Sequence, residues 1–506
     1  MTASDDLFRL IRALTKSERR YFKLFSSIYS GDKTYIALFD AIAKQKTYDE
    51  KRLLKQFEGY KLVKQFSVAK YYLYHQVLKA MCGFHSNEQT EVYRMLQQSD
   101  FLYNKNLYKQ ADKTLLKAKT LALQYEMYPS LLDISSVEHR LALRKDNIHE
   151  IENIPQQEAA YLRKMQANIK NRDFHSQMTV LYNRYGNVRE KKYLQQLEKL
   201  VQKNRSNLEE KNLFSFKSTL RFHAAFLLYF HVKGNHLKAY DHSKKIIELF
   251  QKSPHVIKQN INSYLEHLHN TILIAFESKS YDEGFLLLEQ MKEVSDIAKT
   301  RLQKATWFYS YYHLLLNYYV HRGYFTEAMA QMPSLEKELK EFIDELNNIQ
   351  KIALYYNIAL IYFGCGNIRR TLSWLNIIRN ELFFVTHPEM ECSLSIFYLI
   401  AHYESDHTDL LPNLIKLFYR FLSKKKRIFK YETLLIEFFR KDLGKADSQK
   451  KLINAFQSLK ERMEILAEDP FEKNAFEYFD LISWLDSKIQ NRSFAEVVRE
   501  KAITVL

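Results

Sequence analysis

The fold is decided by the stretch Tyr319-Val-His-Arg-Gly323-Tyr-Phe325-Thr-Glu-Ala328 and its second copy, Tyr362-Phe-Gly-Cys-Gly366-Asn-Ile368-Arg-Arg-Thr371. Each copy has an aromatic residue four positions before a glycine, an apolar residue two positions after it, and a small residue three positions further on. Glycine tolerates the positive φ that is common just after a helix, so each copy predicts a helix end, a short turn and a second helix. The small residue allows the two helices to approach closely.

This order of residues resembles the tetratricopeptide repeat (TPR), with Thr371 in place of the usual alanine in the second copy. The tryptophan near the start of the first TPR helix is absent from both copies. The resemblance implies stacked helical hairpins and no particular activity. We therefore expect an all-α fold: a TPR-like α-solenoid with helical caps at its N- and C-termini.

The composition supports long helices. Glycine and proline number only 10 and 7 among 506 residues, against average usage of about 7% and 5%. So few helix breakers make sheets and loop-rich folds difficult to build. The 35 tyrosines and 34 phenylalanines suit a thin helical array, because tyrosine can fill a seam between helices and keep its hydroxyl in water.

From about residue 90, candidate turns recur at intervals of 40, 40, 48, 45, 44 and 43 residues. They centre on Tyr108, Ile148, Val188, His236, Tyr281, Phe325 and Ile368. This period of about 43 exceeds the roughly 34 residues of the standard repeat, so each unit should hold two helices of roughly 18 residues. Prolines, Pro155 and Pro333 among them, fall where such helices should end.

We divide the chain into three regions. Residues 1–85 are expected to form a helical N-terminal cap domain, residues 90–385 the TPR-like repeats, and residues 386–506 further C-terminal helical repeats and capping helices. A solenoid requires such atypical ends because its terminal repeats have no neighbour on one side.

The N-terminal region shows apolar stripes at helical spacing that predict five short helices. Thr15 with Glu18, and Thr47 with Glu50, have the spacing of capping boxes that open two of these helices. Residues 31–32 are an expected turn. The helices around Gly59 are also compatible with a helix-turn-helix.

No motif for catalysis or cofactor binding is found: GxxxxGK[ST], GxGxxG and HExxH are all absent. In the densest histidine cluster, His267 and His269 point about 200° apart on a helix, whereas a zinc site needs its ligands on one face. Cys82, Cys365 and Cys392 form no CxxC and are expected to be reduced thiols. We expect no enzymatic activity, no cofactor and no metal site.

The positive charge is concentrated in the first 300 residues, where 48 Lys and Arg face 33 Asp and Glu. These residues carry 15 of the 17 net charges, which suggests an anionic partner, although solubility explains the excess as well. Lysine and arginine would neutralise phosphates and exposed tyrosines would stack on unpaired bases. Aromatic residues that face the core need no such ligand. The candidate nucleic-acid contacts are Arg19, Arg20, Lys23, Lys61, Lys64, Lys70, Arg189, Lys191 and Lys192.

Three functions fit these observations. The leading hypothesis is a non-enzymatic scaffold whose basic N-terminal half binds structured RNA, most concretely the ribosome, in translation control, storage or subunit bridging. The second is a protein–protein adaptor that holds a peptide or partner helix in the solenoid groove. The third is a DNA-binding regulator that uses residues 1–85.

The sequence shows no targeting or membrane segment. Residues 1–6 are acidic and lack the basic start and apolar centre of a signal peptide. The longest apolar stretch, around residues 222–232, is too short and too polar at its flanks to span a bilayer. We expect a cytoplasmic protein without a membrane partner.

Overall fold

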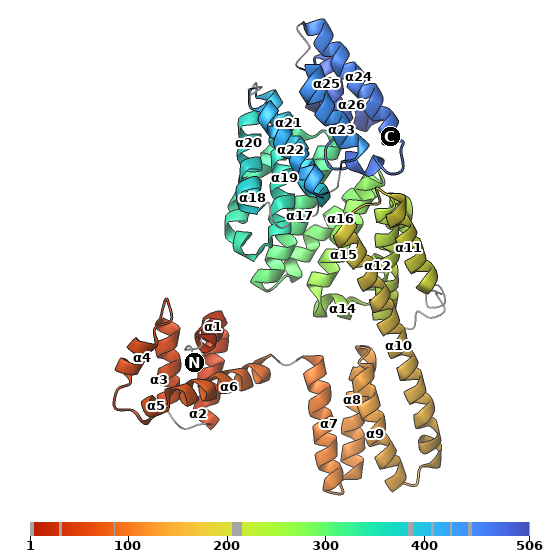
Figure 1. Cartoon of the computed structure of the whole chain (residues 1–506). Coiled ribbons are helices and arrows are strands. Elements are labelled where there is room, and N and C mark those ends of the chain that lie inside the picture. Colours follow the sequence, from red (N-terminus) through yellow and green to blue (C-terminus); the bar gives the residue numbers. More distant parts are fainter. Residues whose placement is uncertain are drawn as a thin grey trace. The chain divides into compact units, whose positions relative to one another are not determined.

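The computed structural model describes residues 5–29, 33–85, 87–204, 215–382, 388–405, 409–425, 428–443 and 448–504. These residues form helices and no strand (Figure 1), so the expected all-α class is confirmed. The turn expected at residues 31–32 lies outside the described residues. The helices belong to two compact units, residues 1–165 and 166–506.

The first six helices of unit 1 enclose a hydrophobic core of their own. Ile11, Phe22, Phe39, Leu53 and Val77, from five of these helices, are fully buried in it. The helices are α1 (Asp6–Ala13), α2 (Lys16–Tyr29), α3 (Lys33–Lys44), α4 (Glu50–Gln56), α5 (Lys61–Lys64) and α6 (Phe66–Phe84).

One of the two expected capping boxes is present. The Thr15 amide donates to the Glu18 carboxylate at 2.6 Å, and the Glu18 amide donates to the Thr15 hydroxyl at 3.3 Å. The prediction of a second capping box, at Thr47 and Glu50, is wrong. Asp49 caps α4 instead, accepting from the Arg52 amide at 3.0 Å, because an aspartate directly before a helix can meet its free amides itself.

The remaining helices of unit 1 pack in sequence order, α7 along α8 and α8 along α9. Small side chains permit their close approach: Ala111, Ala118 and Ala122 of α8 are fully buried. The helices are α7 (Glu88–Asn104), α8 (Tyr108–Gln124), α9 (Tyr128–Arg144) and the start of α10 (Ile148–Tyr185), which continues into unit 2.

The expectation of two helices in every interval between turns is wrong for the interval that begins at Ile148. A single helix of 38 residues, α10, fills this interval. Pro155 lies inside α10, and Pro333 lies inside α18 (Phe325–Phe342), so neither ends a helix. A proline removes one backbone hydrogen bond. Buried side chains beside it, such as Ile154 and Met332, hold the helix against its neighbours.

In unit 2, α13 packs on α12 and α15, and α17 packs on α15 and α19. The other helices follow in chain order around a single large hydrophobic cluster. The elements are α11 (Lys191–Asn204), α12 (Phe216–Val232), α13 (His236–Gln251), α14 (Pro254–Gln259), α15 (Ile261–Glu277), α16 (Tyr281–Glu293), α17 (Arg301–Arg322), α18, α19 (Asn348–Gly364), α20 (Ile368–Ile377), α21 (Pro388–Glu404), α22 (Leu411–Lys425), α23 (Lys430–Glu437), α24 (Gln449–Ala467), α25 (Leu481–Gln490) and α26 (Phe494–Thr504).

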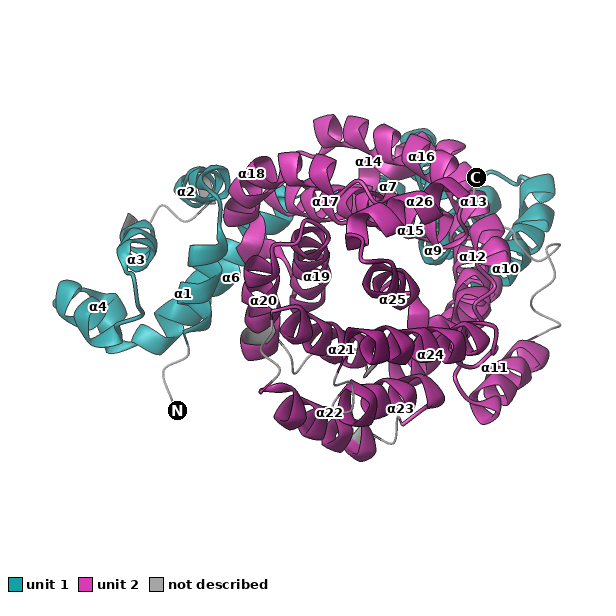
Figure 2. Cartoon of the chain, turned by 90° about the horizontal axis from the view of Figure 1, so that it is seen from above, with its two compact units in different colours: residues 1–165 teal, residues 166–506 magenta. Residues whose placement is uncertain are grey.

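The C-terminal helices lie on the inner side of unit 2. Seen from above, the other helices of the unit surround α25 (Figure 2), and α26 packs on α17. The ring of Phe494 contacts those of Phe325 and Phe363, at centroid distances of 5.8 and 5.4 Å. The beginning and end of the unit also meet: the Lys473 ammonium donates to the Gly234 carbonyl at 3.1 Å.

The turns in the two sequence copies at residues 319–328 and 362–371 have the expected geometry. Gly323 and Gly366 adopt φ values of 69° and 73°, which places both in the left-handed region after a helix. The small residues Ala328 and Thr371 are fully buried between the helices. A left-handed residue lies two positions before each of the seven predicted turn centres: Asn106, Asp146, Gly186, Gly234, Lys279, Gly323 and Gly366.

Replacing Gly364 by alanine should destabilise unit 2 by about 1–3 kcal/mol, as expected for overpacking. A Cβ atom on this last residue of α19 would lie only 2.2 Å from Cδ1 of the Phe325 ring. All three tryptophans, Trp307, Trp374 and Trp484, lie in unit 2, so denaturant unfolding followed by their fluorescence measures the loss. In a Phe325→Leu background the smaller side chain should relieve much of the effect; an equal loss in both backgrounds would contradict this packing.

Candidate functional site

Arg189, one of the predicted nucleic-acid contacts, is buried, and that prediction is corrected. Its side chain is 4% exposed, and its guanidinium donates to Glu432 and Glu472, each at 2.6 Å. The Phe429 ring lies 4.1 Å from the guanidinium carbon. Residues 186–189 are held against the C-terminal part of unit 2, so this charge cannot meet a phosphate.

Three further predicted nucleic-acid contacts, Lys23, Lys70 and Arg19, already bind other groups of unit 1. Lys23 forms an ion pair with Asp40 at 2.6 Å. Lys70 pairs with the Glu50 carboxylate and donates to the Tyr48 hydroxyl, and these groups raise its pKa although burial opposes this. Arg19 donates to a backbone carbonyl of α1. These cations hold helices of the unit together and have less freedom to bind a ligand.

The other five predicted residues are exposed: Arg20, Lys61, Lys64, Lys191 and Lys192. The structure places the first three in unit 1 and the last two at the start of α11 in unit 2. Lys61 and Lys64 are brought together on the single turn of α5.

We name the α5–α6 surface after five exposed residues: Tyr60, Lys61, Lys64, Val68 and Tyr71. The tyrosines are 54% and 67% exposed, which is high for aromatic side chains. Lys61 and Lys64 make no ion pair within the described residues.

Helix α6 presents this surface because its opposite side carries the apolar residues. Leu73, Val77 and Ala80 are fully buried in the core of the first six helices. Tyr71 therefore points outward, where its ring contacts that of His75 on the next turn at a centroid distance of 4.3 Å. The α5–α6 surface therefore contains exposed basic groups on α5 and an exposed aromatic ring on α6.

Unit 2 contains a cavity of about 660 Å³ between its helical hairpins and the C-terminal segment. Its lining is rich in titratable groups. Three acidic residues, Glu277, Glu477 and Asp480, contribute to the lining. The five histidines that also line the cavity are His231, His236, His269, His313 and His321.

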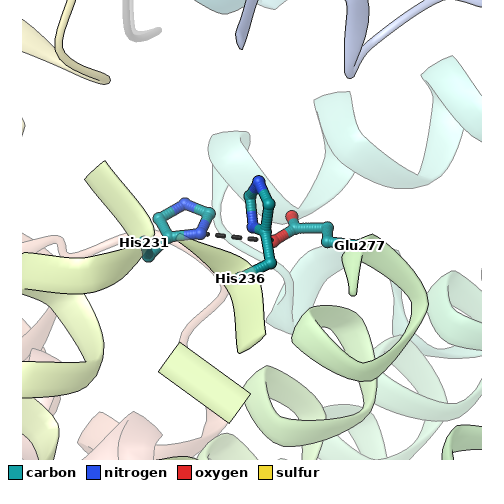
Figure 3. Close-up of side chains that lie close together, drawn as sticks. All are labelled: His231, His236 and Glu277. Carbon is teal, nitrogen blue, oxygen red and sulfur yellow. Dashed lines mark ion pairs between the residues drawn. The ribbon is translucent and has the colours of Figure 1, made fainter. Parts of the chain in front are cut away.

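Two of the histidines that line the cavity, His231 and His236, lie close to Glu277 (Figure 3). His231 lies near the end of α12, His236 begins α13, and Glu277 ends α15. The Nδ1 atoms of both histidines lie 3.2 Å from Glu277 Oε2. His236 Nε2 lies 3.0 Å from Glu477 Oε1 and donates to it.

Burial and charge act in opposite directions on the pKa values of this cluster. Burial disfavours protonation of His236, but Glu277 and Glu477 outweigh it and raise the pKa to about 10. Burial acts to raise the pKa of Glu277, but both histidines hold it well below its usual range. Glu277 and Glu477 also raise the pKa of His231 above its ordinary value, although burial opposes this.

A second histidine pair in the cavity behaves differently. His269 Nε2 and His313 Nδ1 lie 3.0 Å apart, and one donates to the other. Burial lowers the pKa of His269 to about 4 and, together with the neighbouring His269, lowers that of His313 to about 3. These two imidazoles are neutral at neutral pH.

The cluster of His231, His236 and Glu277 was not predicted from the sequence. His267 and His269 are close in sequence on one helix, whereas the side chains of the cluster come from three helix ends. The positions of the predicted turns could have indicated this cluster. His231 and His236 lie on either side of the turn at Gly234, and Glu277 lies just before the next turn, at Lys279. Residues at equivalent helix ends of neighbouring hairpins lie side by side.

Comparison with known proteins finds no family that matches this chain and no curated protein similar to its sequence. Among the helices described here, none has the length and apolar character needed to cross a membrane.

Proposed function

We propose that this protein is a non-enzymatic, cytoplasmic scaffold that binds structured RNA, most concretely the ribosome, through the α5–α6 surface of unit 1. Its hairpins constitute a TPR-like α-solenoid with a period of about 43 residues. Translation control, storage and subunit bridging are the roles that such a partner implies.

The observation that carries this proposal is the exposure of Tyr71 on α6 together with that of Lys61 and Lys64 on the preceding helix. An aromatic ring in water is available for stacking on an unpaired base, which is worth about 1–3 kcal/mol. Ammonium groups without an ion pair in the described structure are available to phosphates. Unit 1 as a whole has 27 Lys and Arg against 19 Asp and Glu, a net charge of +8.

The adaptor alternative requires an open groove on the inner side of the repeats. In unit 2 this side is occupied by α25 and α26. A partner helix would have to separate Phe494 from Phe325 and Phe363. This packing favours the RNA proposal over the adaptor; a partner retained at high salt would favour the adaptor.

The DNA-binding alternative requires a recognition helix after the turn at Gly59. Gly59 does adopt a positive φ of 90°. The helix that follows, α5, has only four residues, and one turn offers few side chains to a major groove. Failure of the full chain to shift duplex DNA at low salt would exclude this function.

Removing the two lysines of the α5–α6 surface should weaken RNA binding. The Lys61→Gln/Lys64→Gln variant should lower the slope of log K against log salt by about 1.4, or roughly 0.7 for each lost phosphate contact on a single strand. The measurement is a fluorescence-anisotropy titration of labelled RNA at several salt concentrations. Lys191→Gln/Lys192→Gln is the matched control, and an equal loss in both variants would contradict a specific surface.

A further inference from the structure

We propose that His231, His236 and Glu277 bind a divalent transition-metal ion such as Zn²⁺. These three residues offer one ligand atom each, and the atoms all lie within 4.8 Å of one another. Two imidazole nitrogens and one carboxylate oxygen are a donor set that zinc uses in sites with an open fourth position.

The two distances between histidine and glutamate donors fit a small tetrahedral ion. Two metal bonds of about 2.0–2.1 Å at a tetrahedral angle place their donor atoms about 3.3 Å apart. The Nδ1 atoms of His231 and His236 each lie 3.2 Å from Glu277 Oε2. An ion can therefore be seated between these atoms with small side-chain movements.

The hydrogen bonding of the cluster is compatible with a cation between its atoms. His231 Nδ1, His236 Nδ1 and Glu277 Oε2 are buried, and within the described residues they form ion pairs with one another but no hydrogen bond of good geometry. His236 donates its other nitrogen to Glu477 at 3.0 Å. A carboxylate in this position fixes the tautomer that directs the free nitrogen of a histidine to a metal.

The acidic groups around the site suit a cation. Glu277 supplies one ligand oxygen, and the Glu477 carboxylate lies 3.0 Å from His236 Nε2. Asp480, on the same cavity, is already paired with Lys501 at 2.9 Å. Imidazole donors select transition metals over Mg²⁺ and Ca²⁺, which prefer oxygen ligands.

The proposed ion would join segments that are distant in the chain. It would tie the turn between α12 and α13 to the end of α15, and through Glu477 to the C-terminal segment of unit 2. Its remaining coordination position would face the cavity, because all three ligands and Glu477 line it. This site is independent of the α5–α6 surface, so either proposal can fail alone.

The test begins with full-length protein freed of metal by a chelator. Isothermal titration with Zn²⁺ should give one tight site per chain, and the Co²⁺ form should show the intense visible absorption of a four-coordinate ion. Glu277→Gln should abolish the site, and Glu477→Gln should weaken it by about 10–100-fold. His269→Gln, a cavity histidine outside the cluster, is the matched control and should bind as the wild type does.

Absence of a stoichiometric Zn²⁺ site in the wild type would overturn the proposal and leave the cluster as an ion-pair network. Unchanged Zn²⁺ affinity in Glu277→Gln would also overturn it by placing the ion elsewhere. Circular dichroism checks that each variant is folded. If Glu277→Gln does not fold, His231→Gln replaces it, and the Co²⁺ spectrum of the wild type still decides whether the site is four-coordinate.

Discussion

Replacing Arg189 by methionine is expected to lower the free energy of unfolding of unit 2 by about 3–5 kcal/mol, as for other broken buried ion pairs. Its guanidinium lies between the carboxylates of Glu432 and Glu472, whose side chains are only 2% and 6% exposed. Methionine keeps much of the apolar volume but leaves both carboxylates without their cation. Glu472 also accepts from the backbone amides of Lys430 and Tyr431, so it cannot move to solvent without a further loss.

Denaturant unfolding followed by tryptophan fluorescence measures this effect, because all three tryptophans lie in unit 2. The matched control is Lys192→Met, which removes a charge from an exposed residue three positions along the chain and should change stability by less than about 0.5 kcal/mol. A similar small change for Arg189→Met would mean that the beginning and end of unit 2 are not joined through this residue.

The second large effect expected is a loss of stability in mild acid from the pair His269 and His313. Their folded-state pKa values, about 4 and about 3, lie below the unfolded value of about 6.5. Below pH 6.5 the unfolded chain binds these two protons and the folded chain does not. The free energy of unfolding should therefore fall by up to about 1.4 kcal/mol per pH unit for each histidine as the pH drops from about 6.5 towards 4.

Unfolding curves at pH 7, 6 and 5 test this dependence. In His269→Gln/His313→Asn the part of the slope due to these residues should disappear. A residual slope is expected from His267, whose pKa burial also lowers to about 4. The same slope in the variant and the wild type would show that the pair is not responsible.

The helix ends could be predicted from the sequence because a turn is specified locally. Gly323 and Gly366 are the residues best able to adopt the left-handed conformation that ends these helices. At Asn106 and Asp146 the same conformation is reached without glycine, and there the regular interval located the turn. Local sequence does not always locate a helix end, however. Pro155 was expected to lie at one, but α10 continues through it.

The surroundings of a charged side chain could not be predicted in the same way. Arg189 and Lys192 stand in one basic and aromatic stretch, yet one is buried and the other is exposed. The difference is due to Glu432, which lies 243 residues further along the chain. The cavity cluster depends on distant residues too, because Glu477 belongs to a C-terminal segment for which the sequence indicated no partner.

The most direct test of the proposed RNA scaffold is co-sedimentation of the full-length protein with ribosomes through a sucrose cushion at increasing salt. We expect the protein to pellet with ribosomes at low salt, to be released steeply as salt rises, and to stay largely in the supernatant when Lys61 and Lys64 are replaced by glutamine. Wild-type protein that remains in the supernatant at low salt, or that pellets equally at every salt concentration, would contradict it.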